Sequence, residues 1–131
     1  GDPAWSGVAR HGFRDLLAVA DVVSLHVPLT QETRGLFGTE TLAAMKPGAI
    51  LINTARGGVV DEPALAEALK RGQLGGAALD VFDVEPVTAE RGAVFDGAPN
   101  LILTPHIAGV TRESNAAVSH VTAQNVLGAL A

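Results

Sequence analysis

The chain has 131 residues, of which 47% are hydrophobic and 18% charged, and its formal net charge is −5. This length suits one domain with a buried core, and no stretch approaches the roughly 18 uninterrupted apolar residues of a membrane span. The absence of cysteine excludes disulfides and zinc–cysteine sites, and an acidic balance without a basic cluster argues against a nucleic-acid partner. The N-terminal residues lack the profile of a signal peptide, so we expect a cytoplasmic protein.

Short apolar runs alternate with amphipathic segments, and glycine and proline separate them. Residues 1–12 have no clear period and are expected to be irregular, as is the segment 83–100. The expected helices are 13–20, 40–45, 62–71 and 111–131, and the expected strands are 22–27, 49–52, 76–82 and 101–104. This order predicts an α/β fold, with a mostly parallel sheet and helices on its faces.

Three residues carry the signal expected at a helix N-terminus. Thr39, Asp61 and Thr111 each precede a helical pattern, and their side-chain oxygens are suited to accept a hydrogen bond from a first-turn amide. Pro63 falls in the first turn after Asp61, where proline is tolerated, and Gly72 is the expected end of that helix. These residues predict where the helices start and stop.

The stretch Ala49–Asp61 reads AILINTARGGVVD and passes abruptly from apolar to polar residues. A short apolar run of this kind is typical of a buried strand in a parallel sheet. The pair Gly57–Gly58 lets the backbone turn sharply or approach a ligand closely. In open parallel sheets ligands bind at the carboxyl ends of the strands, so Arg56 is expected at such an end.

The other predicted strands also finish in ionisable residues. His26 closes the first strand, Asp80 and Glu85 follow the third, and His106 follows the fourth. Because the carboxyl ends of parallel strands share one edge, Arg56, Asp80, Glu85 and His106 are expected to converge there.

The residue types indicate what such a set can do. Arginine is a permanently charged fork suited to a carboxylate or a polarised carbonyl, and histidine exchanges protons near neutral pH. A carboxylate beside the histidine would orient the ring and favour its charged form. An arginine with a His–Glu pair is thus equipped to anchor a 2-oxo acid and move one proton, whereas no serine or cysteine nucleophile and no metal-ligand spacing is evident.

Each of these residues also has a purely structural interpretation. An arginine after a strand is most often solvated, a glutamate before a proline is usually part of a loop, and His106 could be a capping residue. Asp80 inside an apolar strand is harder to dismiss, because a buried carboxylate needs a partner. His11, His26 and His120 are expected to be structural or surface groups.

None of the fifteen glycines forms a G-x-G pair, so the chain contains no G-x-G-x-x-G phosphate loop and no P-loop. If the fold binds a dinucleotide, the residues for its pyrophosphate are not in this sequence.

Four segments together resemble the D-isomer-specific 2-hydroxyacid dehydrogenases, the family of D-3-phosphoglycerate dehydrogenase. They cover residues 20–111 almost without a break and read ADVVSLHVPLTQETRGLF, MKPGAILINTARGGVVDEPALAEAL, GAALDVFDVEP and PNLILTPHIAGVT. The resemblance implies a partial Rossmann-type, doubly wound parallel sheet, the nicotinamide-side half of an NAD-binding domain. Residues 111–131 would form a long C-terminal helix that leads back toward a substrate domain.

The resemblance implies catalytic roles for three residues. Arg56 matches the arginine that holds the carboxylate and carbonyl of the substrate. His106 matches the acid/base that protonates the carbonyl oxygen, and Glu85 matches its carboxylate partner. A complete enzyme of this kind would transfer a hydride between NAD(P)H and a 2-oxo acid or D-2-hydroxy acid.

The cofactor is expected to be NAD, with NADP as the alternative. Asp80 matches the residue that holds the nicotinamide carboxamide, and Asp2 matches the acidic residue that binds the adenine ribose. The full set of implied cofactor positions is Asp2, Val27, Pro28, Thr54, Ala55, Arg56, Asp80, His106, Ile107, Ala108 and Gly109, and no metal is implied.

The resemblance covers only part of such an enzyme, so the chain is expected to be a fragment that is inactive in isolation. The complete form would be a homodimer acting on a small 2-oxo or 2-hydroxy acid, with phosphoglycerate, glyoxylate, sulfolactate and lactate-type acids all open. Two alternatives remain at this point: a non-catalytic, NAD-responsive regulatory module, and an inactive remnant.

Overall fold

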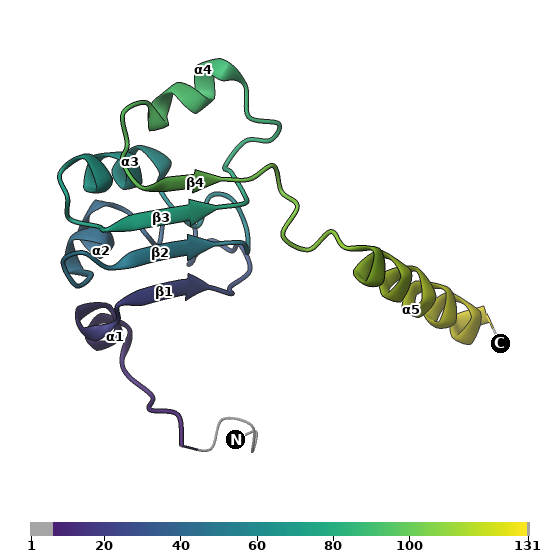
Figure 1. The fold of residues 1–131 in the computed structure, drawn as a ribbon. Coiled ribbons are helices and arrows are strands. Elements are labelled where there is room, and N and C mark those ends of the chain that lie inside the picture. Colours follow the sequence, from purple (N-terminus) through teal and green to yellow (C-terminus); the bar gives the residue numbers. More distant parts are fainter. Residues whose placement is uncertain (1–6, 131) are drawn as a thin grey trace.

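The structure is a computed structural model that describes residues 7–130. Its centre is a four-stranded parallel sheet with the strand order β1-β2-β3-β4 (Figure 1). The strands are β1 (Val22–Leu25), β2 (Ile50–Asn53), β3 (Gly76–Leu79) and β4 (Leu101–Leu103). The predicted α/β class and the parallel sheet are confirmed.

Six helical segments precede, connect or follow these strands in the described residues. They are α1 (Phe13–Val19), α2 (Thr39–Ala44), α3 (Glu62–Lys70), α4 (Ala89–Gly92), the 3-10 turn η2 (Ala93–Phe95) and α5 (Arg112–Leu130). The prediction that residues 83–100 are irregular was therefore wrong for α4 and η2. Helix α4 begins where the Thr88 hydroxyl accepts a hydrogen bond from the backbone N–H of Arg91 at 3.4 Å.

The first and third strands end earlier than predicted, at Leu25 and Leu79. Past Leu79, one further backbone bond joins the Asp80 N–H to the Asn53 carbonyl, and side chains then accept from the backbone. The backbone N–H of Phe82, for example, donates to the Glu85 carboxylate rather than to a neighbouring strand. The extra predicted residues thus belong to the strand-end loops where polar groups gather.

Two of the three predicted caps are confirmed. Asp61 Oδ1 accepts from the Ala64 N–H at 2.9 Å, and Thr111 Oγ1 accepts from the Ser114 N–H at 3.0 Å. The prediction for Thr39 was wrong, because α2 begins at that residue and Gly38, which has no capping side chain, is the N-cap.

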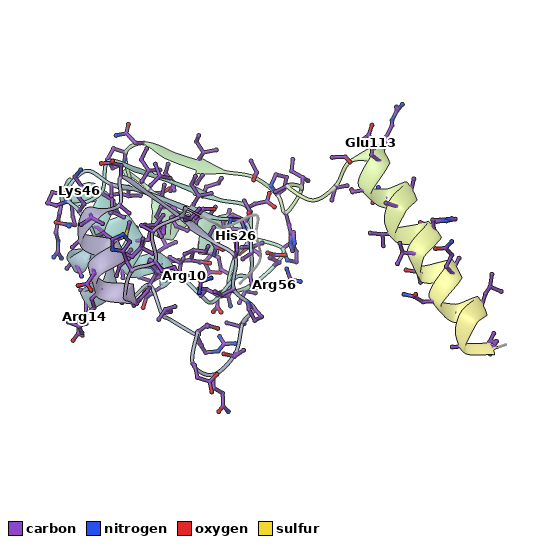
Figure 2. The ribbon with its side chains drawn as sticks, turned by 90° about the horizontal axis from the view of Figure 1, so that it is seen from below. Arg10, Arg14, His26, Lys46, Arg56 and Glu113 are labelled. Carbon is purple, nitrogen blue, oxygen red and sulfur yellow. The ribbon has the colours of Figure 1, made fainter. Side chains whose placement is uncertain are left out.

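Helix α5 stands away from the sheet in both views (Figures 1 and 2). None of its residues is buried, and Val118, Leu127 and Leu130 expose 66%, 68% and 81% of their surface. In the described part of the chain, no helix combines the length and apolar character required to cross a membrane.

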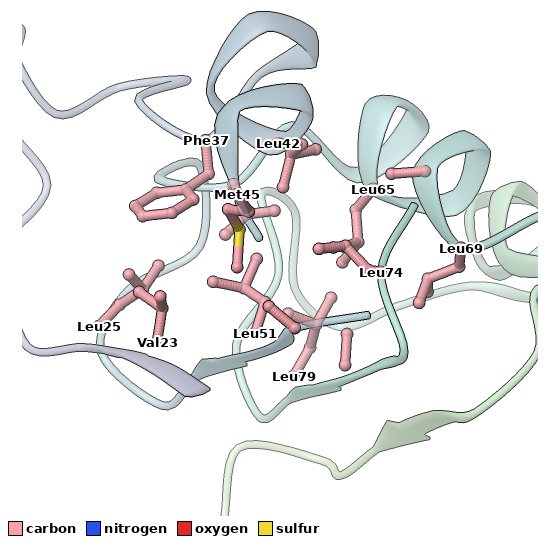
Figure 3. Packing of buried hydrophobic residues seen from close by; sticks show 14 of the residues in the cluster. Val23, Leu25, Phe37, Leu42, Met45, Leu51, Leu65, Leu69, Leu74 and Leu79 are labelled. Atoms are coloured by element: carbon pink, nitrogen blue, oxygen red, sulfur yellow. The ribbon is translucent and has the colours of Figure 1, made fainter. Parts of the chain in front are cut away.

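The hydrophobic core lies between one face of the sheet and helices α2 and α3 (Figure 3). Parallel pairing sets Leu25, Asn53 and Leu79 side by side on this face. All three are buried, and Leu42 of α2 and Leu65 of α3 are fully buried in the same cluster. This packing holds the strands in place and so sets where the loops after the strands begin.

The opposite face of the sheet carries apolar side chains in contact with solvent. Val22, Ile50 and Ile102 are 51%, 41% and 64% exposed. A strand order that follows the chain places the right-handed crossover helices on one face only, so the described residues cover a single side.

Candidate active site

Asp80 lies directly after β3 and is only 3% exposed. Its Oδ1 accepts hydrogen bonds from the Thr104 hydroxyl and from the Ile107 N–H at 2.9 Å, and its Oδ2 accepts from the Ala108 N–H at 2.9 Å. The predicted need of this carboxylate for partners is confirmed. Asp80 thereby ties the end of β3 to the turn that follows β4.

The surroundings of Asp80 favour its charged form. Burial by itself raises the pKa of Asp80, but the Thr104 hydroxyl, the Ala108 and Ile107 amides and the charge of His106 outweigh it. The pKa of Asp80 consequently lies below its usual range. A carboxylate has about four acceptor positions, so one remains for an amide donor beside the three that are used.

Glu85 and His106 form the second contact between the ends of β3 and β4. His106 Nδ1 lies 2.7 Å from Glu85 Oε2, and Glu85 Oε1 accepts from the Phe82 N–H at 2.9 Å. Hydrogen bonds from His106 and Phe82 lower the pKa of Glu85, so this carboxyl is ionised at neutral pH. His106 has a φ of +56°, a conformation in which histidine is enriched and which concentrates at functional sites.

The chemistry of this pair follows from its geometry. Glu85 accepts from Nδ1, which leaves the Nε2 atom of His106 to exchange a proton with another molecule. The two side chains remain 35% and 52% exposed, so their contact adds little to stability and chiefly orients the ring. A cavity of about 670 Å³ adjoins them, and Phe82, Pro86 and Leu103 are among its lining residues.

Arg56 lies in the loop after β2, at the same end of the sheet as His26 (Figure 2). Its Nη1 atom donates to the carbonyl of Ala55 at 2.6 Å. Within residues 7–130, no hydrogen bond or ion pair joins its guanidinium to Glu85 or His106. The strand order brings Arg56 to the expected edge, and its guanidinium makes no other hydrogen bond within the described residues.

The remaining predicted cofactor positions that the structure describes follow the carboxyl ends of β1, β2 and β4. Thr54 is exposed, Val27 is half-buried against the core, and the Pro28 carbonyl accepts from the Thr33 hydroxyl at 2.7 Å. The Gly109 carbonyl accepts from the Ser114 hydroxyl at 2.7 Å. Asp2 lies outside the residues that the structure describes.

Comparison with known proteins decides the family. The model of the D-isomer specific 2-hydroxyacid dehydrogenase, NAD binding domain, matches residues 3–108. The chain belongs to this family. The predicted resemblance is therefore confirmed, and NAD is the cofactor of the D-2-hydroxyacid dehydrogenase family.

Three relatives show the extent of the match. The chain is 57% identical to an (S)-sulfolactate dehydrogenase of Chromohalobacter salexigens, over 98% of the chain and 41% of the relative. It is 45% identical to a D-3-phosphoglycerate dehydrogenase of Bacillus subtilis, over 92% of the chain and 22% of the relative. The D-lactate dehydrogenase of Aquifex aeolicus complexed with NAD and lactic acid superimposes with a TM-score of 0.81 at 36% identity. The match covers 92% of this chain and 40% of that dehydrogenase. The chain thus spans less than half the length of these dehydrogenases.

Asn53 and Thr104 help to shape this candidate site, although the sequence did not single them out. Asn53 is 1% exposed; its Nδ2 donates to the Arg56 carbonyl at 3.0 Å, and its Oδ1 accepts from the Ala55 N–H at 3.1 Å. Asn53 braces the loop that carries Arg56, as Thr104 braces Asp80. The available signal was a polar residue at the end of an apolar strand, which a buried position obliges to find partners.

Proposed function

We propose that this chain is the nicotinamide-side part of an NAD-dependent oxidoreductase that interconverts a D-2-hydroxy acid and its 2-oxo acid. The observation that supports this best is the Glu85–His106 pair, held at 2.7 Å beside a cavity at the carboxyl edge of the sheet. Membership of the dehydrogenase family supplies the reaction class.

Each catalytic residue has a chemical task in this proposal. The Arg56 guanidinium binds the carboxylate of the 2-oxo acid and polarises its carbonyl, because it is an exposed, planar, charged fork of donors. Protonated His106 gives the Nε2 proton to the carbonyl oxygen during reduction and takes it back during oxidation. Glu85 keeps the ring oriented and stabilises its charged form.

The cofactor positions fit the nicotinamide end of NAD. Asp80 retains one acceptor position for the carboxamide, and Thr54, Ala55 and the backbone of 107–109 line the same edge as Val27 and Pro28. When bound, the reduced cofactor supplies the hydride that adds to the carbonyl carbon. Asp2 would bind the adenine ribose and so favour NAD over NADP.

The chain matches only part of the length of its relatives, and this bears on the activity expected of the isolated chain. Because it spans 41% of the sulfolactate dehydrogenase, we propose that it works within a longer, homodimeric, cytoplasmic protein without a nucleic-acid partner, and that the isolated chain is inactive. Its 57% identity to that relative makes sulfolactate the first 2-hydroxy acid to assay, before phosphoglycerate, glyoxylate and lactate.

A direct test uses the full-length protein that contains this chain. NADH oxidation is followed with a panel of 2-oxo acids, and NADH binding is measured in parallel by fluorescence. Turnover of at least one acid is expected. Tight NADH binding without turnover of any acid would instead indicate a regulatory module.

A further inference from the structure

The loop that carries Arg56 touches the loop that carries Glu85. We name them the arginine loop (residues 54–58) and the glutamate loop (residues 80–86). A side chain at Gly57 would overlap the Phe82 carbonyl group, and one at Gly58 would lie 2.9 Å from Asp83 Oδ1. Gly57 is therefore required for the two loops to pack backbone against backbone, whereas Gly58 has a φ of +76° that favours glycine.

A single carboxylate fastens the glutamate loop to helix α3. Glu62 Oε1 accepts a hydrogen bond from the Asp83 backbone N–H at 2.7 Å. Glu62 is the first residue of α3, whose N-terminus is capped by Asp61. A hydrogen bond to a charged acceptor is about twice as strong as a neutral one, so it ties the loop to a rigid element.

Arg34 adds a weaker contact to the same loop. Its Nη1 atom lies 3.3 Å from Asp83 Oδ1, but the two side chains are 60% and 54% exposed, and solvent screens such pairs. The bond from the Asp83 N–H to Glu62 is shorter and engages the backbone. Of the two contacts, it is the one that holds the backbone of the glutamate loop directly.

We propose that Glu62 is a positioning residue that holds the glutamate loop, and with it Glu85, in register with His106 and the arginine loop. This inference rests on the proposed roles of Arg56, Glu85 and His106. Glu62 itself acts through the backbone of Asp83 and touches neither substrate nor cofactor.

The hydrogen bonds within the loop carry this effect to the imidazole. With Asp83 fixed, the adjacent Phe82 N–H donates to Glu85 Oε1 at 2.9 Å. That bond leaves Oε2 for His106 Nδ1 at 2.7 Å. Each oxygen of the Glu85 carboxylate thus has a hydrogen-bond partner: Oε1 bonds its own loop, and Oε2 bonds His106.

The test compares three variants in the full-length protein. Glu62→Ala removes the acceptor, Glu62→Gln keeps an amide oxygen at the same place, and Glu67→Ala removes a carboxylate from the same helix as a control. We expect Glu62→Ala to lower kcat by about 10- to 100-fold, since small misplacements of catalytic groups have effects of this size. The KM for NADH should stay unchanged, because Asp80, the cofactor position in this loop, is held independently by the Thr104 hydroxyl and the Ile107 and Ala108 amides.

The conservative variant separates positioning from general stability. Glu62→Gln should recover most of the kcat, and Glu67→Ala should retain all of it. A kcat in Glu62→Ala equal to that of Glu67→Ala, or a Glu62→Gln variant as slow as Glu62→Ala, would overturn the proposal.

His106→Ala in the same assay distinguishes this inference from the function on which it rests. Full turnover in His106→Ala defeats the proposed function itself. Loss of turnover in His106→Ala together with a normal Glu62→Ala defeats only the positioning role.

Discussion

The Nδ1 atom of His106 and the Oε2 atom of Glu85 lie 2.7 Å apart, although 21 residues separate the two in the sequence. The contact joins the loops after two neighbouring parallel strands, β3 and β4. Because the pair is half exposed, its energy contributes little to folding, and its consequence is the orientation of one imidazole.

The lowered pKa of Glu85 gives the pair a defined pH dependence. His106 and the Phe82 N–H stabilise the ionised carboxyl, whereas nearby Asp80 opposes it. The contact is therefore present above the ordinary glutamate pKa and is lost as the pH falls through the lowered, folded-state pKa. We expect the kcat of the full-length protein to fall on the acidic side and Glu85→Gln to flatten that limb. An identical acidic limb in Glu85→Gln would assign the titration to another group.

Asp80 should be sensitive to loss of its charge. Its carboxylate accepts three hydrogen bonds in a buried position, and an amide would turn one acceptor into a donor facing another donor. We expect Asp80→Asn to reduce the free energy of unfolding by about 1–3 kcal/mol, as is usual for an unsatisfied buried polar group. Urea denaturation measures this change, with the exposed Asp96→Asn as control. Equal midpoints for the two variants would show that the three bonds contribute nothing.

Gly57 should tolerate no side chain. A methyl group there would overlap the Phe82 carbonyl, and neither backbone can move without shifting its loop. We expect Gly57→Ala to destabilise the protein by about 1–3 kcal/mol, the usual range for overpacking. Gly128→Ala is the matched control, because that position in α5 meets open space. A Gly57→Ala protein as stable as the control would mean that the two loops are not in contact.

Much of the site could be predicted from the sequence because parallel topology constrains it. Once four strands run in the same direction, Asp80, Glu85 and His106 must lie along one edge. The buried carboxylate of Asp80 was expected to have hydrogen-bond partners, and it accepts such bonds in the structure, for example from the Ala108 N–H. The roles of Arg56, Glu85 and His106 and of the cofactor positions stay predictions.

The sequence could not show contacts that depend on how separate elements pack. The bond from the Asp83 N–H to Glu62 joins a loop to a helix 21 residues earlier, and neither residue stands out in its local pattern. Likewise, Thr39 has the side chain of a cap, yet its helix starts one residue early because Gly38 can take the N-cap conformation. Local sequence patterns predict where helices and strands lie. Packing between separate elements determines where each one ends and which residues it contacts.

We propose that His106 exchanges the proton for 2-oxo acid reduction while Arg56 holds the acid. The measurement is kcat and the NADH dissociation constant of full-length His106→Ala and Arg56→Ala, with His120→Ala on exposed α5 as control. We predict that His106→Ala lowers kcat by about 100- to 10,000-fold, the range for loss of a general acid, and that Arg56→Ala also abolishes turnover. Both variants should still bind NADH, because the other cofactor positions, Asp80 among them, are retained. Unchanged turnover in His106→Ala and Arg56→Ala would contradict the account.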